Sequence, residues 1–578
     1  MNILEQKLTA LVEQLYPQAS SHSLVNTLLD AIGCDDSSTL PPRHRNLWNE
    51  NDAWLITYGN SIVKNDEAPL QTLKQFLDSE LQGIVTGVHV LPFFPFSSDD
   101  GFAVIDYLKV NDALGDWKHI ESLSRDYDVM GDLVINHISS RSRWFENFKK
   151  QVDPGKDYFH AVDPAVDLTQ VVRPRPTPLL REVETRAGKK YVWCTFGPDQ
   201  VDVNFANTDV LIEYVRILGA YLDAGIRMFR MDAIAFLWKE LGTPCIHHSN
   251  THAIIRLLRL LIEARRNDAI IVTETNVPNR ENLTYFGNNN QAHIIYNFSL
   301  PPLVLFTLFS GDCKHLKTWL MSMPPAQDGT CYLNFLASHD GIGLRPTEGL
   351  LSDRELQSML DGMRSSGGVV SMRKMPDGNE KPYELNIALF DAFKTTKTNE
   401  IDGLQIERFI CAHAIMLALE GIPAIYIHSF FGTENDYARK EHTGRARSIN
   451  RHVWQLTELA DKLKNKDCHE RQVFDELKRL VCIRRSQSAF HPNATQFTLH
   501  LGLQLFGFWR QSADRKQSIF CVSNITNQQQ TLPLGNLNLI VTDEWCDLIS
   551  GVRLKDLDDN VALAPYQTMW ISNLAPTE

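Results

Sequence analysis

The chain has 578 residues, of which 43% are hydrophobic and 22% charged, and it carries a net charge of -13. These proportions are those of an ordinary globular protein and exclude a disordered chain, a collagen-like repeat or a coiled coil as the main structure. An acidic protein repels a phosphate backbone, so we expect no nucleic acid partner. We also expect no membrane partner, because no stretch reaches the roughly eighteen apolar residues that a span requires.

The N-terminal segment and the cysteines both favour a cytoplasmic protein. The first twenty residues carry acidic side chains and lack an apolar core, so we expect no signal peptide there. Leu4, Leu8, Leu11 and Leu15 instead predict an amphipathic helix. The ten cysteines are scattered without a C-x-x-C pair, which favours reduced core thiols over disulfides or a zinc site. Reduced thiols are typical of the cytoplasm.

Short apolar runs alternate with longer amphipathic segments between about residues 50 and 430. The eight runs are 54–58, 84–91, 130–137, 226–232, 269–274, 293–298, 332–337 and 422–428. Continuous apolar runs are typical of strands that are buried on both faces, and the intervening segments include 209–224 and 251–266, which have helical spacing. The pattern therefore predicts an α/β protein built on a (β/α)8 TIM barrel.

Two connections are too long for a single helix. The first follows the third run and contains the Pro/Arg-rich stretch 173–178, which we interpret as part of a subdomain inserted over the barrel mouth. A partner-binding polyproline segment is the alternative. The second follows the seventh run and contains a Gly-rich, charged piece at 365–384, which we expect to be a mobile loop rather than core.

The pattern changes again after about residue 493. Short β-like runs there predict a C-terminal antiparallel β domain: 496–503, 505–510, 518–523, 537–541, 561–563 and 568–571. The predicted division of the chain is an N-terminal helical extension at 1–49, the catalytic barrel at 50–141 and 206–492, the inserted subdomain at 142–205 and the C-terminal β domain at 493–578.

Ionisable residues gather at the carboxyl ends of the predicted strands, where barrels of this type build their active sites. Asp232, Glu274 and Asp340 stand at or just after the ends of the fourth, fifth and seventh runs. Alternation along the fourth strand puts Arg230 on the same face as Asp232, where it would hold that carboxylate ionised, as a nucleophile requires. Glu274 in a dry pocket would stay protonated and act as a general acid. Two such carboxyl groups suit a retaining glycosidic displacement.

Each of these residues has a simpler explanation when it is taken alone. A strand-end aspartate is more often a helix N-cap, a buried histidine is usually a satisfied core residue, and an Arg-x-Asp pair is often a structural ion pair. Their joint occurrence, in order, at the ends of the third, fourth, fifth and seventh strands favours a catalytic site.

Four segments, 132–137, 225–232, 271–274 and 337–340, resemble the four ordered motifs of the α-amylase family (glycoside hydrolase family 13). Within that family the chain is most similar to the sucrose phosphorylase group, through GVHVLPFFPFSSDDGF (87–102), INHIS (135–139), RPRP (173–176), FGPDQVDVNF (196–205), RMDAIAF (230–236), LGTPCIHH (241–248), SHDGIG (338–343) and ARSINRH (446–452). The resemblance implies a barrel with an insertion after its third strand and a C-terminal β domain.

The resemblance also implies a role for each matching residue. Asp232 would be the nucleophile, Glu274 the general acid/base and Asp340 the carboxylate that stabilises the transition state. The implied substrate-binding residues are Arg230, His137 and His339 around the nucleophile and the glucose, Asp99 and Arg447 as a pair that closes the glucose subsite, Phe102 and Phe196 as its apolar platform, Arg175 and Gln200 toward the acceptor or phosphate, and Tyr383 and Glu384 in the acceptor loop.

The implied activity is that of a hexosyltransferase-type phosphorylase, in which inorganic phosphate takes the glucosyl group and leaves as α-glucose 1-phosphate. The acceptor side departs from sucrose phosphorylases: Thr275-Asn276 replaces Val-His, Phe236 replaces a tyrosine, and Tyr383-Glu384 stands where Tyr-Gln is usual. These changes disfavour fructose as the leaving group, and the acceptor loop and the LGTPCIHH segment resemble relatives that act on glucosylglycerate, glucosylglycerol or sucrose 6-phosphate. The resemblance therefore leads us to expect 2-O-α-glucosyl-D-glycerate as the substrate. The candidate contacts to an anionic acceptor are Arg373, Lys374 and His248. Sucrose, sucrose 6-phosphate and glucosylglycerol are the alternative substrates.

Two other functions compete with this one. A retaining α-glucosidase or glucosyltransferase would use the same residues. A non-catalytic amylase-like ectodomain is disfavoured, because such proteins need a membrane span and usually lack the carboxylates. The resemblance implies no cofactor and no metal site, and no loop offers four or more clustered oxygen ligands for calcium. The expected partners are a small glucoside and phosphate, and we expect a monomer or a homodimer.

Overall fold

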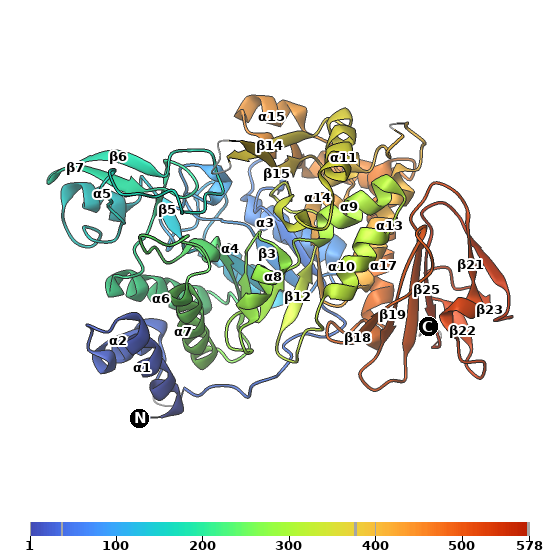
Figure 1. The fold of residues 1–578 in the computed structure, drawn as a ribbon, viewed down its shortest axis with the longest axis horizontal. Helices are drawn as coiled ribbons and strands as arrows, with labels where there is room; N and C mark the ends of the chain where they lie inside the picture. Colours follow the sequence, from blue (N-terminus) through green and yellow to red (C-terminus); the bar gives the residue numbers. More distant parts are fainter. Residues whose placement is uncertain (1, 36–37, 375–378, 399, 575–578) are drawn as a thin grey trace.

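The computed structural model describes residues 2–35, 38–374, 379–398 and 400–574. Eight parallel strands close into a barrel (Figure 1). In barrel order they are β1 (Trp54–Thr57), β3 (Gly87–Val90), β4 (Asp128–Val134), β9 (Met228–Asp232), β10 (Ile270–Thr273), β11 (Ile294–Tyr296), β12 (Cys331–Asn334) and β16 (Ile422–Tyr426). Each predicted run overlaps one of these strands, which confirms the TIM barrel.

Helices connect the strands around the outside of the barrel. They are α3 (Pro69–Phe76), α4 (Trp117–Asp126), α6 (Thr208–Asp223), α7 (Ser249–Arg265), α8 (Asn279–Asn282), α9 (Leu300–Ser310), α10 (Lys314–Ser322), α11 (Asp353–Ser365), α12 (Leu389–Ala392) and α13 (Gln405–Ala418), and β16 is followed by α14 (Ile427–Phe430), α15 (Tyr437–Thr443), α16 (Leu456–Lys464) and α17 (His469–Arg485). The predicted helices at 209–224 and 251–266 correspond to α6 and α7. Both begin with a side-chain cap, in which Asn207 and His248 accept a hydrogen bond from a backbone N–H two residues on.

Two N-terminal helices pack against the barrel helices. These are α1 (Ile3–Leu15), which contacts α7, and α2 (Ser21–Ile32), which contacts α6 (Figure 1). The predicted apolar face of α1 is largely confirmed, because Leu4, Leu8 and Leu15 are buried. The fourth fully buried position is Val12 rather than Leu11.

A long excursion between β4 and β9 carries four strands and a helix. They are β5 (His137–Ser139), α5 (Arg143–Lys150), β6 (Leu180–Thr185), β7 (Gly188–Trp193) and β8 (Gln200–Asp202). β6 and β7 form a hairpin, while β5 pairs with β8. The β5–β8 pair brings Gln200 opposite Ser139, close to the end of the third barrel strand.

A second excursion follows β12 and forms a three-stranded sheet in the order β13 (Ile342–Gly343), β15 (Glu380–Asn386) and β14 (Val369–Lys374). The prediction of a mobile loop at 365–384 is therefore wrong for most of that piece. Two of its segments belong to an antiparallel ladder that is held by backbone hydrogen bonds. Residues 375–378 lie outside the described residues. A short parallel pair, β2 (Ile62–Val63) with β17 (Trp454–Gln455), lies elsewhere.

The C-terminal region is an all-β unit at the right of Figure 1. Its strands are β18 (Thr495–Thr498), β19 (Leu505–Gln511), β20 (Ser518–Asn524), β21 (Gln530–Pro533), β22 (Trp545–Asp547), β23 (Arg553–Leu554), β24 (Asn560–Leu563) and β25 (Thr568–Ser572). The predicted strand at 537–541 is wrong: Asn538 has a left-handed φ of 52°, and Ile540 and Val541 are 59% and 84% exposed. Strands β21, β22 and β23 were not predicted.

All ten cysteines are free, as expected. Seven of them are buried, where they behave as small apolar side chains. None of the helices in the described part of the chain combines the length and the apolar character that a membrane crossing requires.

Candidate active site

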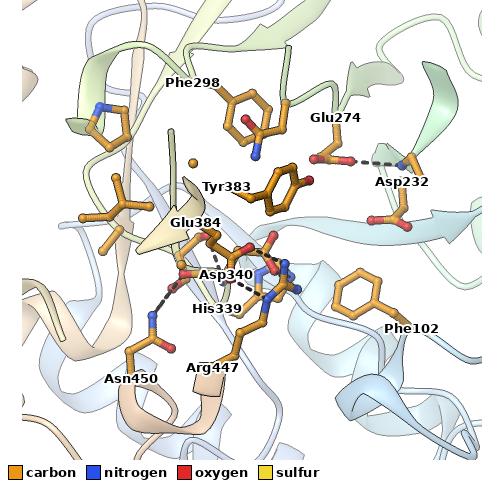
Figure 2. Close-up of a pocket in the computed structure, with 18 of the residues that line it drawn as sticks. Phe102, Asp232, Glu274, Phe298, His339, Asp340, Tyr383, Glu384, Arg447 and Asn450 are labelled. Atoms are coloured by element: carbon orange, nitrogen blue, oxygen red, sulfur yellow. Dashed lines mark hydrogen bonds and ion pairs between the residues drawn. The ribbon is translucent and has the colours of Figure 1, made fainter. Parts of the chain in front are cut away.

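A pocket of about 880 Å³ opens at the carboxyl ends of the barrel strands (Figure 2). Arg230 and two of the candidate contacts to an anionic acceptor, Arg373 and His248, are not among its lining residues, and the side chain of the third, Lys374, lies outside the described part of the structure. The other predicted site residues line it: Asp99, Phe102, His137, Arg175, Phe196, Gln200, Asp232, Glu274, His339, Asp340, Tyr383, Glu384 and Arg447. These residues come from distant parts of the chain, and the barrel together with its two excursions brings them to one cavity.

Asp232 is the last residue of β9 and is held by Arg230 on the same face of the strand. Arg230 Nη1 donates a hydrogen bond to Asp232 Oδ1 at 2.8 Å and another to Asp132 Oδ1. Asp132 is fully buried, and its other oxygen lies 2.7 Å from His89 Nε2. The guanidinium is therefore fixed from below by a second carboxylate, which orients it toward Asp232.

Glu274 directly follows β10 and lies beside Asp232. Its Oε2 accepts a hydrogen bond from the backbone N–H of Ala233 at 3.0 Å, as the dashed line at the right of Figure 2 shows. Ala233 has a left-handed φ of 52°, a conformation that an alanine rarely adopts. This turn directs the N–H of the residue after Asp232 at the carboxylate of Glu274.

Burial raises the pKa of both carboxyl groups. The pKa of Glu274 rises to about 7 because the group is buried and lies near Asp232 and Asp340. The pKa of Asp232 also rises to about 7, because burial outweighs the positive charge of Arg230. The positive charge of Arg230 therefore does not restore the usual low pKa of Asp232. Of the two carboxyl groups, only Asp232 accepts a hydrogen bond from Arg230, so the negative charge is assigned to Asp232 and the proton to Glu274.

Asp340 lies in the loop after β12 and carries the opposite balance. Burial by itself would raise its pKa, but the positive charge of Arg447, together with those of Arg230 and Arg451, holds that pKa below its usual range. The backbone around Asp340 is fixed by Asn450 Nδ2, which donates to the Asp340 carbonyl at 3.0 Å, and by Arg451 Nε, which donates to the His339 carbonyl at 2.7 Å. Asp340 is therefore a positioned carboxylate that stays ionised.

Asp99 and Arg447, predicted as the pair that closes the glucose subsite, both line the pocket but form no ion pair with each other in the described part of the chain. Arg447 reaches between Asp340 and Glu384 (Figure 2), with its Nε 2.9 Å from Glu384 Oε1 and its Nη2 2.6 Å from Glu384 Oε2. Asp99 instead accepts a hydrogen bond from Gln200 Nε2 at 3.2 Å. Glu384 is only 2% exposed, so its carboxylate is paired by Arg447 rather than by solvent.

Phe102 and Phe196, predicted as the apolar platform of the glucose subsite, both line the pocket. The Phe102 ring stacks on the His339 ring with centroids 4.9 Å apart, and the Phe196 ring lies 5.2 Å from that of His137. Burial lowers the pKa of His339 to about 3, so its imidazole is neutral. Gln200 also lies here, with its Nε2 3.2 Å from His137 Nε2.

One wall of the pocket, named the acceptor wall after the predicted acceptor loop, is formed by Tyr383, Glu384, Phe298, Asn276 and Arg175. Tyr383 and Phe298 lie beside Glu274 in Figure 2, and the guanidinium carbon of Arg175 lies 5.6 Å from the centre of the Tyr383 ring. Asn276 lines this wall, and its Oδ1 is buried without a hydrogen-bond partner. His248 lies elsewhere: its Nε2 is 2.9 Å from Glu240, and its ring stacks on a tryptophan.

The sequence analysis did not predict a role in the site for several of the lining residues. They are Ser338, Phe298, Pro301, Phe335, Ile342, Gly343, Ile387, Leu389 and Asn450. Asn450 stands within the ARSINRH segment and Phe298 at the end of the sixth apolar run, so their positions were marked although their roles were not. The apolar residues after β15 carry no signal that separates them from ordinary core residues.

Comparison with known proteins gives consistent matches. Residues 79–343 match the model of the α-amylase catalytic domain. The chain is 41% identical to the glucosylglycerate phosphorylase of Allomeiothermus silvanus over 91% of each chain, and 38% identical to that of Escherichia coli K12 over 98% of this chain and all of that one. The structure of the sucrose 6F-phosphate phosphorylase from Thermoanaerobacter thermosaccharolyticum superposes with a TM-score of 0.72 and 22% identity, covering 89% of this chain and 98% of that one.

Proposed function

Because the chain belongs to the α-amylase family, in the branch that contains glucosylglycerate phosphorylases, we propose that it is a retaining glycoside phosphorylase. Its substrates are 2-O-α-glucosyl-D-glycerate and inorganic phosphate, and its products are D-glycerate and α-glucose 1-phosphate. The observation that carries this proposal is the match to two such phosphorylases over at least nine-tenths of this chain, together with three carboxylates that converge in one pocket.

The first displacement uses Asp232 and Glu274. An Asp232 oxygen attacks the anomeric carbon and forms a glycosyl ester, while the bond from that carbon to the glycerate oxygen breaks. Glu274 gives its proton to the departing oxygen. The protonation states suit this step, since Arg230 favours the ionised Asp232 and burial favours the protonated Glu274.

The second displacement returns the glucosyl group to phosphate. A phosphate oxygen attacks the anomeric carbon, the ester bond to Asp232 breaks, and Glu274 regains its proton from the hydrogen phosphate or from solvent. Two displacements at one carbon retain the α configuration. Arg175 is the candidate phosphate contact, because it lines the acceptor wall and no described residue forms an ion pair with it.

The other pocket residues hold the glucose. The ionised Asp340 accepts hydrogen bonds from sugar hydroxyls, which strengthen as positive charge develops on the ring. Phe102 offers an apolar face, and Asp99 with Arg447 closes the far end of the subsite. One glucosyl unit therefore fits between that end and the catalytic pair.

We further propose a cytoplasmic enzyme, monomeric or homodimeric, that needs no metal or other cofactor. The ten free cysteines favour a reducing compartment. Within the described part of the chain, no group of three or more His, Cys, Asp or Glu side chains has the arrangement of a metal site. Activity that survives dialysis against EDTA would agree with this, and activity that disappears and returns with Ca²⁺ would contradict it.

The decisive experiment runs the reaction in reverse. The purified protein is given α-glucose 1-phosphate with D-glycerate, glycerol, fructose or fructose 6-phosphate, and released phosphate is followed. We expect fast release with D-glycerate. Release only with another acceptor would keep the phosphorylase and change its substrate. If none of the four acceptors gives faster phosphate release than the acceptor-free control, the proposed phosphorylase activity is contradicted.

A further inference from the structure

Arg345 is a cation without a partner at the edge of the acceptor wall. It follows β13, is half-buried, and makes no hydrogen bond or ion pair through its side chain to any described residue. Its Nε is buried and unpartnered. A half-buried guanidinium normally forms several hydrogen bonds, because leaving its donors unpaired is costly.

A second guanidinium lies within electrostatic reach of it. Arg373, on β14, also has a buried and unpartnered Nε. Burial lowers the pKa of Arg373, and the nearby charge of Arg345 lowers it further. The carboxylate of Glu348, 2.6 Å from Arg373 Nη2, is the only ion-pair partner of either arginine among the described residues. Glu348 therefore pairs with Arg373, and Arg345 is left without an ion-pair partner among the described residues.

The two arginines belong to the same small sheet as the acceptor wall. β13 and β14 flank β15, which carries Tyr383 and Glu384. The N–H of Leu344, directly before Arg345, donates to the Tyr383 carbonyl at 3.0 Å. Gly343, two residues before Arg345, lines the pocket against Asn276. Gly343 and Tyr383, which line the pocket, therefore belong to the sheet that also carries Arg373, and Arg345 follows its edge strand β13.

The chemistry of the pair fits a carboxylate. A guanidinium presents parallel N–H donors that match the two oxygens of a carboxylate, and a second guanidinium adds charge without competing for the same oxygen lone pairs. Arg175, the cation assigned to phosphate, lies instead over the Tyr383 ring, with its guanidinium carbon 5.6 Å from the ring centre.

We propose that Arg345 and Arg373 form an anion subsite that binds the carboxylate of the acceptor and so selects glycerate over neutral polyols. This inference rests on the proposed function, because it assumes that D-glycerate is the leaving group and the reverse acceptor. It identifies Arg345 as the main specificity-determining residue, since Arg373 already shares its charge with Glu348.

The test compares D-glycerate with glycerol, which has the same three carbons and lacks the carboxylate. For each variant, kcat/KM is measured for both acceptors with α-glucose 1-phosphate as donor. In Arg345→Gln we expect the glycerate-to-glycerol ratio to fall about ten- to a hundredfold, the effect of losing a charge-assisted pair. Arg345→Lys keeps the charge and should recover part of that ratio. Arg373→Gln should lower the ratio less than Arg345→Gln does.

The matched control is Arg354→Gln, because Arg354 is exposed on α11 of the same excursion. It should leave the ratio as in the unmodified protein, and melting temperatures show that each variant is folded. A wild-type protein without a preference for glycerate would contradict the proposed function. A wild-type preference that Arg345→Gln leaves intact, or a variant that loses both acceptors equally, would overturn the anion subsite alone.

Discussion

The catalytic carboxylates and the acceptor wall are built in different ways. Asp232 ends β9 and Glu274 directly follows β10, so barrel strands place both of them, while Asp340 lies in the loop after β12. The acceptor wall comes from a three-stranded sheet outside the barrel and from the excursion that carries Arg175. Chemistry that stays constant is thus placed by the rigid frame, while the choice of acceptor depends on elements that can change without disturbing the barrel.

The largest expected loss of turnover comes from the catalytic carboxylates at the ends of the barrel strands. Asp232→Asn removes the nucleophile, so kcat should fall by about 10⁴-fold or more in both reaction directions and with every acceptor. The measurement is phosphate release from α-glucose 1-phosphate with each acceptor in turn. Asp209→Asn, an exposed aspartate at the start of α6, is the control. Turnover that survives in Asp232→Asn would contradict the assignment of this strand end as the reacting group.

Replacing the acid should give a smaller and substrate-dependent effect. Glu274→Gln cannot protonate the leaving group, so we expect kcat for glucosylglycerate to fall about 10³-fold. With α-glucosyl fluoride, whose leaving group needs no proton, the loss should be at most about tenfold. Equal losses with both donors would contradict a general-acid role.

The same pair predicts a bell-shaped pH profile of kcat/KM. Protonation of Asp232 as the pH falls removes the nucleophile, and deprotonation of Glu274 as the pH rises removes the acid. Because burial raises the pKa of each group to about 7, both limbs should lie near neutrality, with the maximum between them. The basic limb should disappear in Glu274→Gln with α-glucosyl fluoride. A plateau that extends unchanged from pH 5 to 9 would contradict the raised pKa values.

Glu384 links the acceptor wall to the catalytic carboxylates, so a variant at this residue shows which of the two it serves. It belongs to the acceptor sheet, yet its carboxylate bonds to Arg447, which also pairs with Asp340. Glu384→Gln should therefore weaken glucosyl binding and lower kcat/KM about tenfold, the scale of one charge-assisted hydrogen bond, and equally for glycerate and glycerol. A loss confined to glycerate would place Glu384 in the acceptor subsite instead.

The same contrast explains how far the sequence could predict the structure. Barrel strands are buried on both faces, so their apolar runs stand out, and the residues at their ends follow directly. The pairing of Arg447 with Glu384 joins residues 63 apart and leaves no local pattern. β14 and β15 mix charged, polar and apolar residues without a continuous apolar run, so no local pattern marks their ladder. In the C-terminal unit, the apolar run at 537–541 fails as a strand because Asn538 takes a left-handed turn.

The smallest expected effect sharpens the comparison on the acceptor side. A Cβ on Gly343 would lie 2.6 Å from the amide atoms of Asn276, so Gly343→Ala must displace that side chain from its place beside Glu274. Displacing one side chain costs about 0.5–1 kcal/mol, which corresponds to a loss of about two- to fivefold in kcat/KM for acceptors. Gly535→Ala is the matched control, because nothing lies within 4 Å of its added methyl group. Hydrolysis of α-glucose 1-phosphate, in which water is the acceptor, needs no contact with Asn276 and should change less than transfer to glycerate. If hydrolysis falls as much as transfer, Gly343 helps to position the catalytic carboxylates. The acceptor wall and the carboxylates would then be less independent than their different strands indicate.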